Sequence, residues 1–297
     1  MNTNELKASE IVPEYKRKRK PVEGIHIVAG FVLTFWTLLI LSVILLTFMF
    51  SLKTSVEIFQ DPWALPTSLA MALRNYDKAW SIARMGTYLL NSTFIVSVSL
   101  MISLVVSAMA AYVLTRFNFK GSKLLLICLI LGMGVPLQLM VIPLYRQMAF
   151  FSLVDTYIGL VIIYATVCIP FTVFVLTGFF SSIPSDIIEA ATVDGSSQNR
   201  LFWTILMPLA QPGLIAVTSF NFVWIWNEYL LALVFTTRPT LRTISLGMYA
   251  LQGSMTYTVD WGALFAGVVI MIVPAAIIFL LMNKYIVSGV TVGAVKG

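Results

Sequence analysis

The stretch EAATVDGSSQNRLFWTILMPL, from Glu189 to Leu209, separates two long apolar runs and guides the interpretation of the whole chain. Its first half carries the acidic residues Glu189 and Asp194, and Gly195 follows directly. Its second half is apolar at helical spacing and contains Pro208 near its end. A connecting segment of this length between apolar runs usually has a function of its own.

The composition of the chain indicates an integral membrane protein. The 297 residues are 59% hydrophobic and only 11% charged, and the mean hydropathy is +0.92. A soluble domain carries about 25% charged residues, so the composition excludes a soluble protein of this size. A helix crosses roughly 30 Å of hydrocarbon with about 20 apolar residues. Six runs meet this requirement: residues 26–50, 88–114, 124–145, 157–179, 213–235 and 261–285.

These runs predict an all-α membrane protein with six transmembrane helices in one domain, residues 21–297. Residues 1–20 are polar, lack periodicity and are predicted to be disordered. They end in YKRKRK, a basic cluster that resists translocation and therefore places the N-terminus in the cytoplasm. With six spans the C-terminus is cytoplasmic too. The cluster also suits contact with anionic membrane lipid. Because most of the +6 net charge lies there, we expect no nucleic-acid partner.

Local signals predict that the insert forms two short helices joined by a tight turn. Pro184 and Ser185 mark the start of the first helix, and Gly195 can take the left-handed conformation that ends it. Ser196 or Ser197 can cap the second helix. Apolar residues repeat at helical spacing on both: Ile187, Ile188, Ala191, Leu201, Phe202, Ile205 and Leu209. Such an amphipathic hairpin suits docking into a groove on a partner, and the alternative is a simple connector.

The insert resembles the EAA motif of ABC-transporter permeases, in which Glu-Ala-Ala is followed at fixed spacing by Gly and by Ile-x-Leu-Pro. Here Met207 replaces the usual Leu, a change that conserves volume. The resemblance implies that residues 184–209 form a cytoplasmic coupling hairpin between the fourth and fifth spans. The residues that it implies in coupling to an ATPase are Glu189, Ala190, Ala191, Asp194, Gly195, Ile205 and Pro208.

Further stretches are similar to MalG-type carbohydrate permeases over nearly the whole chain after the first span. They include NYDKAW at 75–80, AAYVLTRFNFKG at 110–121 and WNEYLLALVF at 226–235. The resemblance implies one permease of a sugar or oligosaccharide importer in the bacterial cytoplasmic membrane. Its implied partners are a second homologous permease, two ATPase subunits and an extracytoplasmic solute-binding protein.

The chain carries no motif for chemistry of its own. It has no GxxxxGK[ST] phosphate-binding loop, no nucleophile elbow and no paired-histidine metal motif. We therefore expect no catalytic residue, metal or cofactor on this chain, with ATP and magnesium on the partner ATPase. Three alternatives stay open: a permease of another ABC importer branch, a membrane-embedded enzyme and an ion-coupled secondary transporter. The lack of a catalytic pair argues against the enzyme.

The fifth predicted span contains polar residues that are costly in lipid and should face protein or water. A sugar path needs hydrogen-bonding groups beside aromatic rings. This requirement predicts a substrate path formed by Asn221, Trp224, Asn227, Glu228 and Tyr229. In the alternative interpretation, Asn227 and Glu228 hold helices together or gate the path.

The external loop 236–260 contains small and polar residues that suit a mobile segment. We predict that Gly247, Gln252 and Gly253 contact a docked solute-binding protein. Deletion of residues 249–254 is then expected to reduce transport while leaving basal ATP hydrolysis intact.

Overall fold

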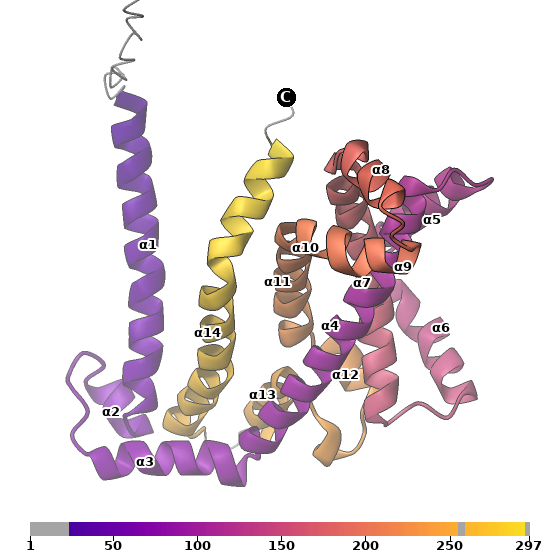
Figure 1. The fold of residues 1–297 in the computed structure, drawn as a ribbon. Coiled ribbons are helices and arrows are strands. Elements are labelled where there is room, and N and C mark those ends of the chain that lie inside the picture. Colours follow the sequence, from indigo (N-terminus) through magenta and orange to yellow (C-terminus); the bar gives the residue numbers. More distant parts are fainter. Residues whose placement is uncertain (1–23, 255–258, 295–297) are drawn as a thin grey trace, which may run out of the picture. The chain divides into compact units, whose positions relative to one another are not determined.

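The computed structural model describes residues 24–254 and 259–294, and every regular element within these ranges is helical (Figure 1). The predicted disorder of residues 1–20 lies outside the described residues. The chain divides into two units, one ending at Leu46 and one beginning at Thr47. Over its described residues, the first unit is most of helix α1, and the second contains all other elements.

Among the described residues, four helices are long and apolar enough to cross a membrane, and each matches a predicted span. They are α1 (Gly24–Ser51), α4 (Met85–Arg116), α7 (Tyr157–Ser182) and α14 (Trp261–Ala294). Two sharply bent pairs pass the same test only if each pair counts as one crossing: Ser122–Met133 with Leu137–Phe150, and Gln198–Leu209 with Gln211–Asn227. The all-α class is therefore confirmed for the described chain, and the number of six spans stays a prediction.

The third predicted span, residues 124–145, is not a continuous helix. Instead, α5 (Ser122–Met133) and α6 (Leu137–Phe150) meet at an angle of 107°. Gly134 ends α5, and Pro136 precedes α6. Proline has no backbone N–H and disfavours a helical conformation in the residue before it, so the helix cannot run through this point.

The fifth predicted span, residues 213–235, is also interrupted. α11 (Gln211–Asn227) ends before Glu228, whose backbone is extended, and α12 (Leu230–Phe235) follows. A helix end leaves backbone groups without helical partners, so this break requires other hydrogen-bonding groups. The side chain of Glu228 supplies them, as described below.

The polar insert forms one group of short helices, and a second group lies at the opposite end of α4 (Figure 1). The insert contains α8 (Ser185–Val193), α9 (Gln198–Arg200), the π-helical η2 (Leu201–Leu206) and α10 (Met207–Leu209). The other group contains α2 (Ser55–Gln60), α3 (Leu69–Asp77), the π-helical η1 (Lys78–Ile82), the 3-10 helix η3 (Pro239–Leu241) and α13 (Ile244–Ser254).

α4 and α7 form a closely packed pair. Ser99, Ser103 and Ser107 lie one turn apart on α4 and are buried, and such small residues let two helix backbones approach closely. The Ser99 hydroxyl donates to the carbonyl oxygen of Val161 on α7 at 3.2 Å. One apolar cluster surrounds the half of this pair near α13, and a second surrounds the half near α8–α10. Packing therefore fixes both ends of α4.

Candidate functional site

The insert forms two helical legs around a glycine turn, as its local signals predict. Gly195 has a φ of +75°, and the N–H of Ser196 donates to the carbonyl oxygen of Ala191 at 3.0 Å. The hydroxyl oxygen of Ser197 accepts from the N–H of Arg200 at 3.3 Å and caps the second leg. These contacts are the usual ones for a glycine-terminated helix followed by a serine-capped helix.

One face of the α8–α10 hairpin is buried against the ends of α4 and α7. Ala191 and Phe202 belong to the apolar cluster that contains Tyr112 of α4 and Phe180 of α7. The Phe202 ring centroid lies 5.3 Å from that of Tyr112 and 6.4 Å from that of Phe180. Ile205 packs against the same cluster. Two of the predicted coupling residues, Ala191 and Ile205, therefore position the hairpin.

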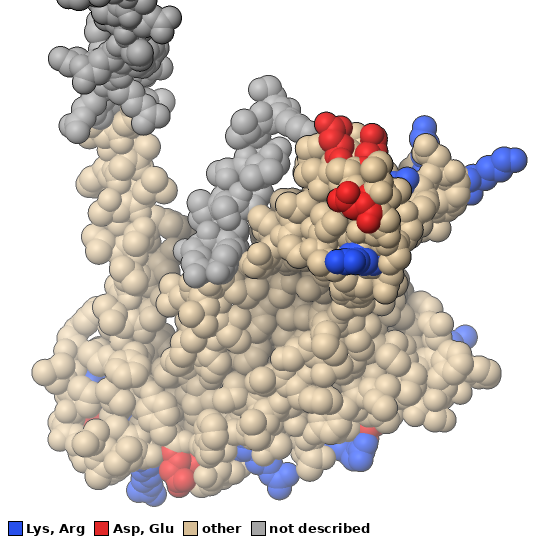
Figure 2. Space-filling model, in the orientation of Figure 1, with Lys and Arg blue, Asp and Glu red and all other residues tan. Residues whose placement is uncertain are grey.

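The opposite face of the hairpin is exposed. Glu189, Ala190, Asp194 and Pro208 all lie on the surface, and Val193 at the end of α8 is 88% exposed. Figure 2 shows acidic side chains gathered at the end of the molecule where α8 and α9 lie. The residues of the EAA motif are thus divided between an anchored apolar face and an exposed polar face.

Two residues of α4 that the sequence analysis did not single out hold the hairpin and the end of α7 that leads into it. The Tyr112 hydroxyl donates to Oε1 of Gln198 at 2.6 Å. Nη2 of Arg116 donates to the carbonyl oxygens of Phe180 and Ile183, each at 2.7 Å. These carbonyls lie where α7 ends, a place that favours positive charge and lacks helical donors. Both residues fall in the stretch AAYVLTRFNFKG, but nothing local in it indicates what they contact.

The break after α11 is organised by the buried residue Glu228. Its carboxylate accepts from the Tyr164 hydroxyl at 2.8 Å and from the N–H groups of Leu231 at 2.8 Å and Ala232 at 3.3 Å. Its backbone carbonyl oxygen accepts from the Ser245 hydroxyl at 2.6 Å. A buried carboxylate is costly unless it is hydrogen-bonded, and here each of these bonds joins one helix to another or caps one.

The other predicted path residues divide between the interior and the surface. Asn221 is buried and donates to a threonine hydroxyl of α7 at 2.8 Å. Trp224 is 37% exposed, and Tyr229 is partly exposed and stacks on Tyr249 of α13 with ring centroids 5.9 Å apart. Asn227 is exposed and lines a groove of about 250 Å³ between α11 and α14. The structure therefore does not bring all five residues onto one surface.

The external segment is not the mobile loop that the sequence analysis predicts, at least over its described part. Residues 244–254 form α13, and a Cβ on Gly247 would lie 2.1 Å from the ring of Tyr88 on α4. This glycine therefore permits close helix packing. Gln252 and Gly253 are exposed near the end of α13 and stay candidates for contact with a solute-binding protein.

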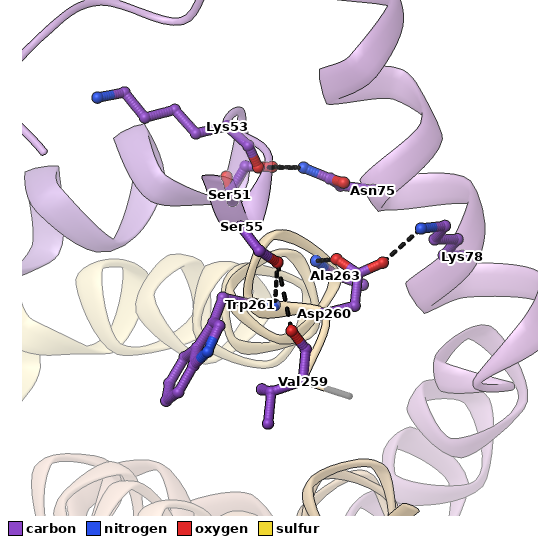
Figure 3. A network of polar contacts seen from close by, with 9 residues as sticks. All are labelled: Ser51, Lys53, Ser55, Asn75, Lys78, Val259, Asp260, Trp261 and Ala263. Atoms are coloured by element: carbon purple, nitrogen blue, oxygen red, sulfur yellow. Dashed lines mark hydrogen bonds and ion pairs between the residues drawn. The ribbon is translucent and has the colours of Figure 1, made fainter. Parts of the chain in front are cut away.

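A polar network at the start of α14 also escaped the sequence analysis (Figure 3). Buried Asn75 donates to the carbonyl oxygens of Ser51 at 3.0 Å and Lys53 at 2.8 Å. Lys78 forms an ion pair with Asp260. Burial acts to raise the pKa of Asp260, but hydrogen bonds from Lys78 and from a backbone N–H outweigh it and lower this pKa. The network joins segments far apart in the sequence, which no local pattern indicates.

A chain of apolar helices that carries an anchored hairpin with the EAA spacing has the architecture of an ABC-transporter permease. In agreement, residues 103–292 match the family described as the binding-protein-dependent transport system inner membrane component. This match covers more than half of the chain, and the chain belongs to that family. The resemblance inferred from the EAA motif is therefore confirmed.

Several relatives are permeases of sugar uptake systems. The chain is 36% identical over 264 residues to the diacetylchitobiose uptake system permease protein NgcG of Streptomyces coelicolor, covering 89% of this chain and 87% of that protein. It is 34% identical to the trehalose/maltose transport system permease protein MalG of Thermococcus litoralis, covering 87% and 94%. The fold is similar to a chain of a bacterial ABC transporter involved in the import of the acidic polysaccharide alginate. That match has a TM-score of 0.76 and 22% identity, and it covers 92% of this chain and 99% of that chain.

Proposed function

We propose that this chain is one permease subunit of a binding-protein-dependent ABC importer for a sugar or oligosaccharide. The observation that carries the proposal is the α8–α10 hairpin with its EAA spacing in a chain of this family. The names of the relatives, which refer to diacetylchitobiose and to trehalose and maltose, support the sugar class. The chain has no phosphate-binding loop, so we assign ATP and magnesium to two partner ATPase subunits.

In this proposal the exposed face of the hairpin docks on an ATPase subunit. Glu189, Ala190 and Asp194 form the contact, and Gly195 shapes the turn between the legs. Binding of ATP closes the ATPase pair and moves the hairpin, and the helices packed on it follow. The permease alternates in this way between inward-open and outward-open states. Both termini are cytoplasmic, and the solute-binding protein docks on the opposite side, beside Gln252 and Gly253.

A second, homologous permease completes the translocation path. On this chain the exposed groups suited to sugar are the rings of Trp224 and Tyr229 and the amide of Asn227. Aromatic faces pack on the apolar faces of sugar rings, and an amide offers both donors and an acceptor. Buried Asn221 and Glu228 act indirectly, because they hold the helices that carry these groups.

Two rival functions make different predictions. A permease of another ABC importer branch retains the hairpin and the ATPase but imports a different solute. An ion-coupled secondary transporter takes up its solute without ATP. Uptake into vesicles that persists without ATP and depends on an ion gradient would contradict our proposal.

The test is co-purification of the ATPase with this chain, together with uptake of labelled diacetylchitobiose and trehalose. Glu189→Lys reverses a charge at the contact and should lose more ATPase than Glu189→Ala does. Asp77→Lys, the same reversal at an exposed residue of α3, is the matched control and should retain the ATPase. Wild-type co-purification and uptake with Glu189→Lys would show that the insert is only a connector.

A further inference from the structure

α4 connects the hairpin with the external segment at the other end of the helix. Tyr112 and Arg116 lie one turn apart near its C-terminal end, so they face the same side. Near its N-terminal end, the amide nitrogen of Asn91 donates to the carbonyl oxygens of Thr240 at 2.8 Å and Arg242 at 2.9 Å. α4 is continuous between these groups, and along its axis it separates Asn91 from Tyr112 by about 32 Å and from Arg116 by about 38 Å.

The contacts at the inner end hold one leg of the hairpin and the end of α7 that leads into the other. Tyr112 binds Gln198, the first residue of α9. Arg116 binds the carbonyl oxygens of Phe180 and of Ile183, the residue that ends α7 and that Pro184 separates from α8. Hydrogen bonds from a charged donor are stronger than neutral ones. Nε of Arg116 is buried and has no hydrogen-bond partner among the described residues. A shift of α9 or of the end of α7 relative to α4 would break these hydrogen bonds.

The N-terminal end of α4 is also held by specific hydrogen bonds. The Tyr157 hydroxyl donates to Oδ1 of Asn91 at 2.8 Å, so both ends of this amide are used. The hydroxyl oxygen of Ser92 accepts from the N–H of Ile244, the first residue of α13, at 2.7 Å. Gly247 of α13 packs on the ring of Tyr88, three residues before Asn91 on α4. A displacement of α4 must therefore reach α13.

We propose that Tyr112 and Arg116 are positioning residues that transmit hairpin movement into α4, and that Asn91 passes it to the external segment 240–244. This inference rests on the proposed function, because it requires an ATPase that moves the hairpin. The residues act in transmission and not in docking, since the exposed Glu189 face does not include them.

The test follows the external segment directly in the complete complex with its ATPase. A fluorophore is attached at Gln252→Cys in a Cys128→Ser background, which removes the exposed native thiol. The parent chain should show a change in fluorescence on addition of ATP. Arg116→Gln should reduce this change at least tenfold and Tyr112→Phe about fivefold, because the first removes the charged donor of two hydrogen bonds and the second removes one neutral hydrogen bond. Arg116→Lys, which can donate to the same carbonyls, should restore part of it.

Matched controls separate transmission from folding and from docking. Lys123→Gln, an exposed cation of α5, and Thr93→Val, whose hydroxyl bonds only within α4, should behave like the parent. Asn91→Leu should abolish the fluorescence response. The double variant with Arg116→Gln should lose no more of the response than Asn91→Leu alone, because both residues belong to the same transmission route.

The amount of bound ATPase and its basal hydrolysis should stay at the parent level in the Arg116 and Tyr112 variants. Three results would each overturn the inference. They are a full fluorescence response to ATP in Arg116→Gln, a loss of bound ATPase in that variant as large as its loss of response, and no response to ATP in the parent. If instead Glu189→Lys still binds the ATPase, the docking proposal fails. The two failures are therefore distinguishable.

Discussion

At the scale of single residues, the hairpin turn depends on Gly195. Its φ is +75°, and no atom lies within 4 Å of the position that a Cβ would occupy, so a substitution there is costly for conformational reasons alone. Gly195→Val should destabilise the turn by about 1–3 kcal/mol. Gly195→Asn should cost less, because asparagine enters the left-handed region more readily. Co-purification of the ATPase measures the difference, and equal recovery with both variants would contradict the expectation.

The residues differ in how far the sequence alone could predict them. Gly195 and Ser197 were predictable because their partners are neighbours in the chain. The packing of Gly247 on Tyr88 was not predictable, because Tyr88 lies on another helix. Glu228 was recognised as unusual from the cost of a carboxylate in lipid, but the sequence did not reveal its partner Tyr164.

At the scale of the element, α2 begins with a complete capping box. The Thr54 hydroxyl oxygen accepts from the N–H of Glu57 at 3.2 Å, and Oε2 of Glu57 accepts from the N–H of Thr54 at 2.7 Å. The hydrogen bond from the Thr67 hydroxyl, followed by those from Thr54, lowers the pKa of Glu57 from 4.5 to about 2. A depressed folded-state pKa means that this stabilisation is present above pH 4.5 and is lost as the pH falls toward 2.

Hydrogen exchange of the α2 amides, corrected for intrinsic rates, should therefore show protection that decreases between pH 4.5 and pH 2. Glu57→Gln should remove this pH dependence and lower the protection above pH 4.5. Protection that is independent of pH in the parent chain would contradict the expectation.

The elements themselves were predictable where the apolar run is uninterrupted. The predicted span 157–179 corresponds to α7, which begins at the same residue and ends at Ser182. The run 124–145 forms two helices and not one, because apolar composition reports burial in lipid and not helix continuity, although Gly134 and Pro136 are local signals of a break. The run 213–235 is interrupted for a tertiary reason, since Glu228 ends α11 through distant partners.

At the scale of the whole molecule, the polar network of Figure 3 ties the segment after the first span to α3 and α14. A Cβ on Gly262 would lie 2.3 Å from the backbone oxygen of Lys53, which cannot move aside as a flexible side chain would. Gly262→Ala should therefore destabilise the detergent-solubilised chain by about 1–3 kcal/mol. Gly178→Ala on α7, where no atom lies within 4 Å, is the matched control. Equal melting temperatures for the two variants would contradict this account.

The 107° bend between α5 and α6 determines which backbone groups of this chain would face lipid. α5 rises about 18 Å and α6 about 21 Å, so neither crosses roughly 30 Å of hydrocarbon by itself. If the pair makes one crossing, Gly134, Val135 and Pro136 lie at membrane depth, and all three are exposed on this chain. Irregular backbone is tolerated there only when protein or water covers it. In the proposed function the second permease is the protein that would cover this bend, so a copy synthesised without it would leave irregular backbone facing lipid.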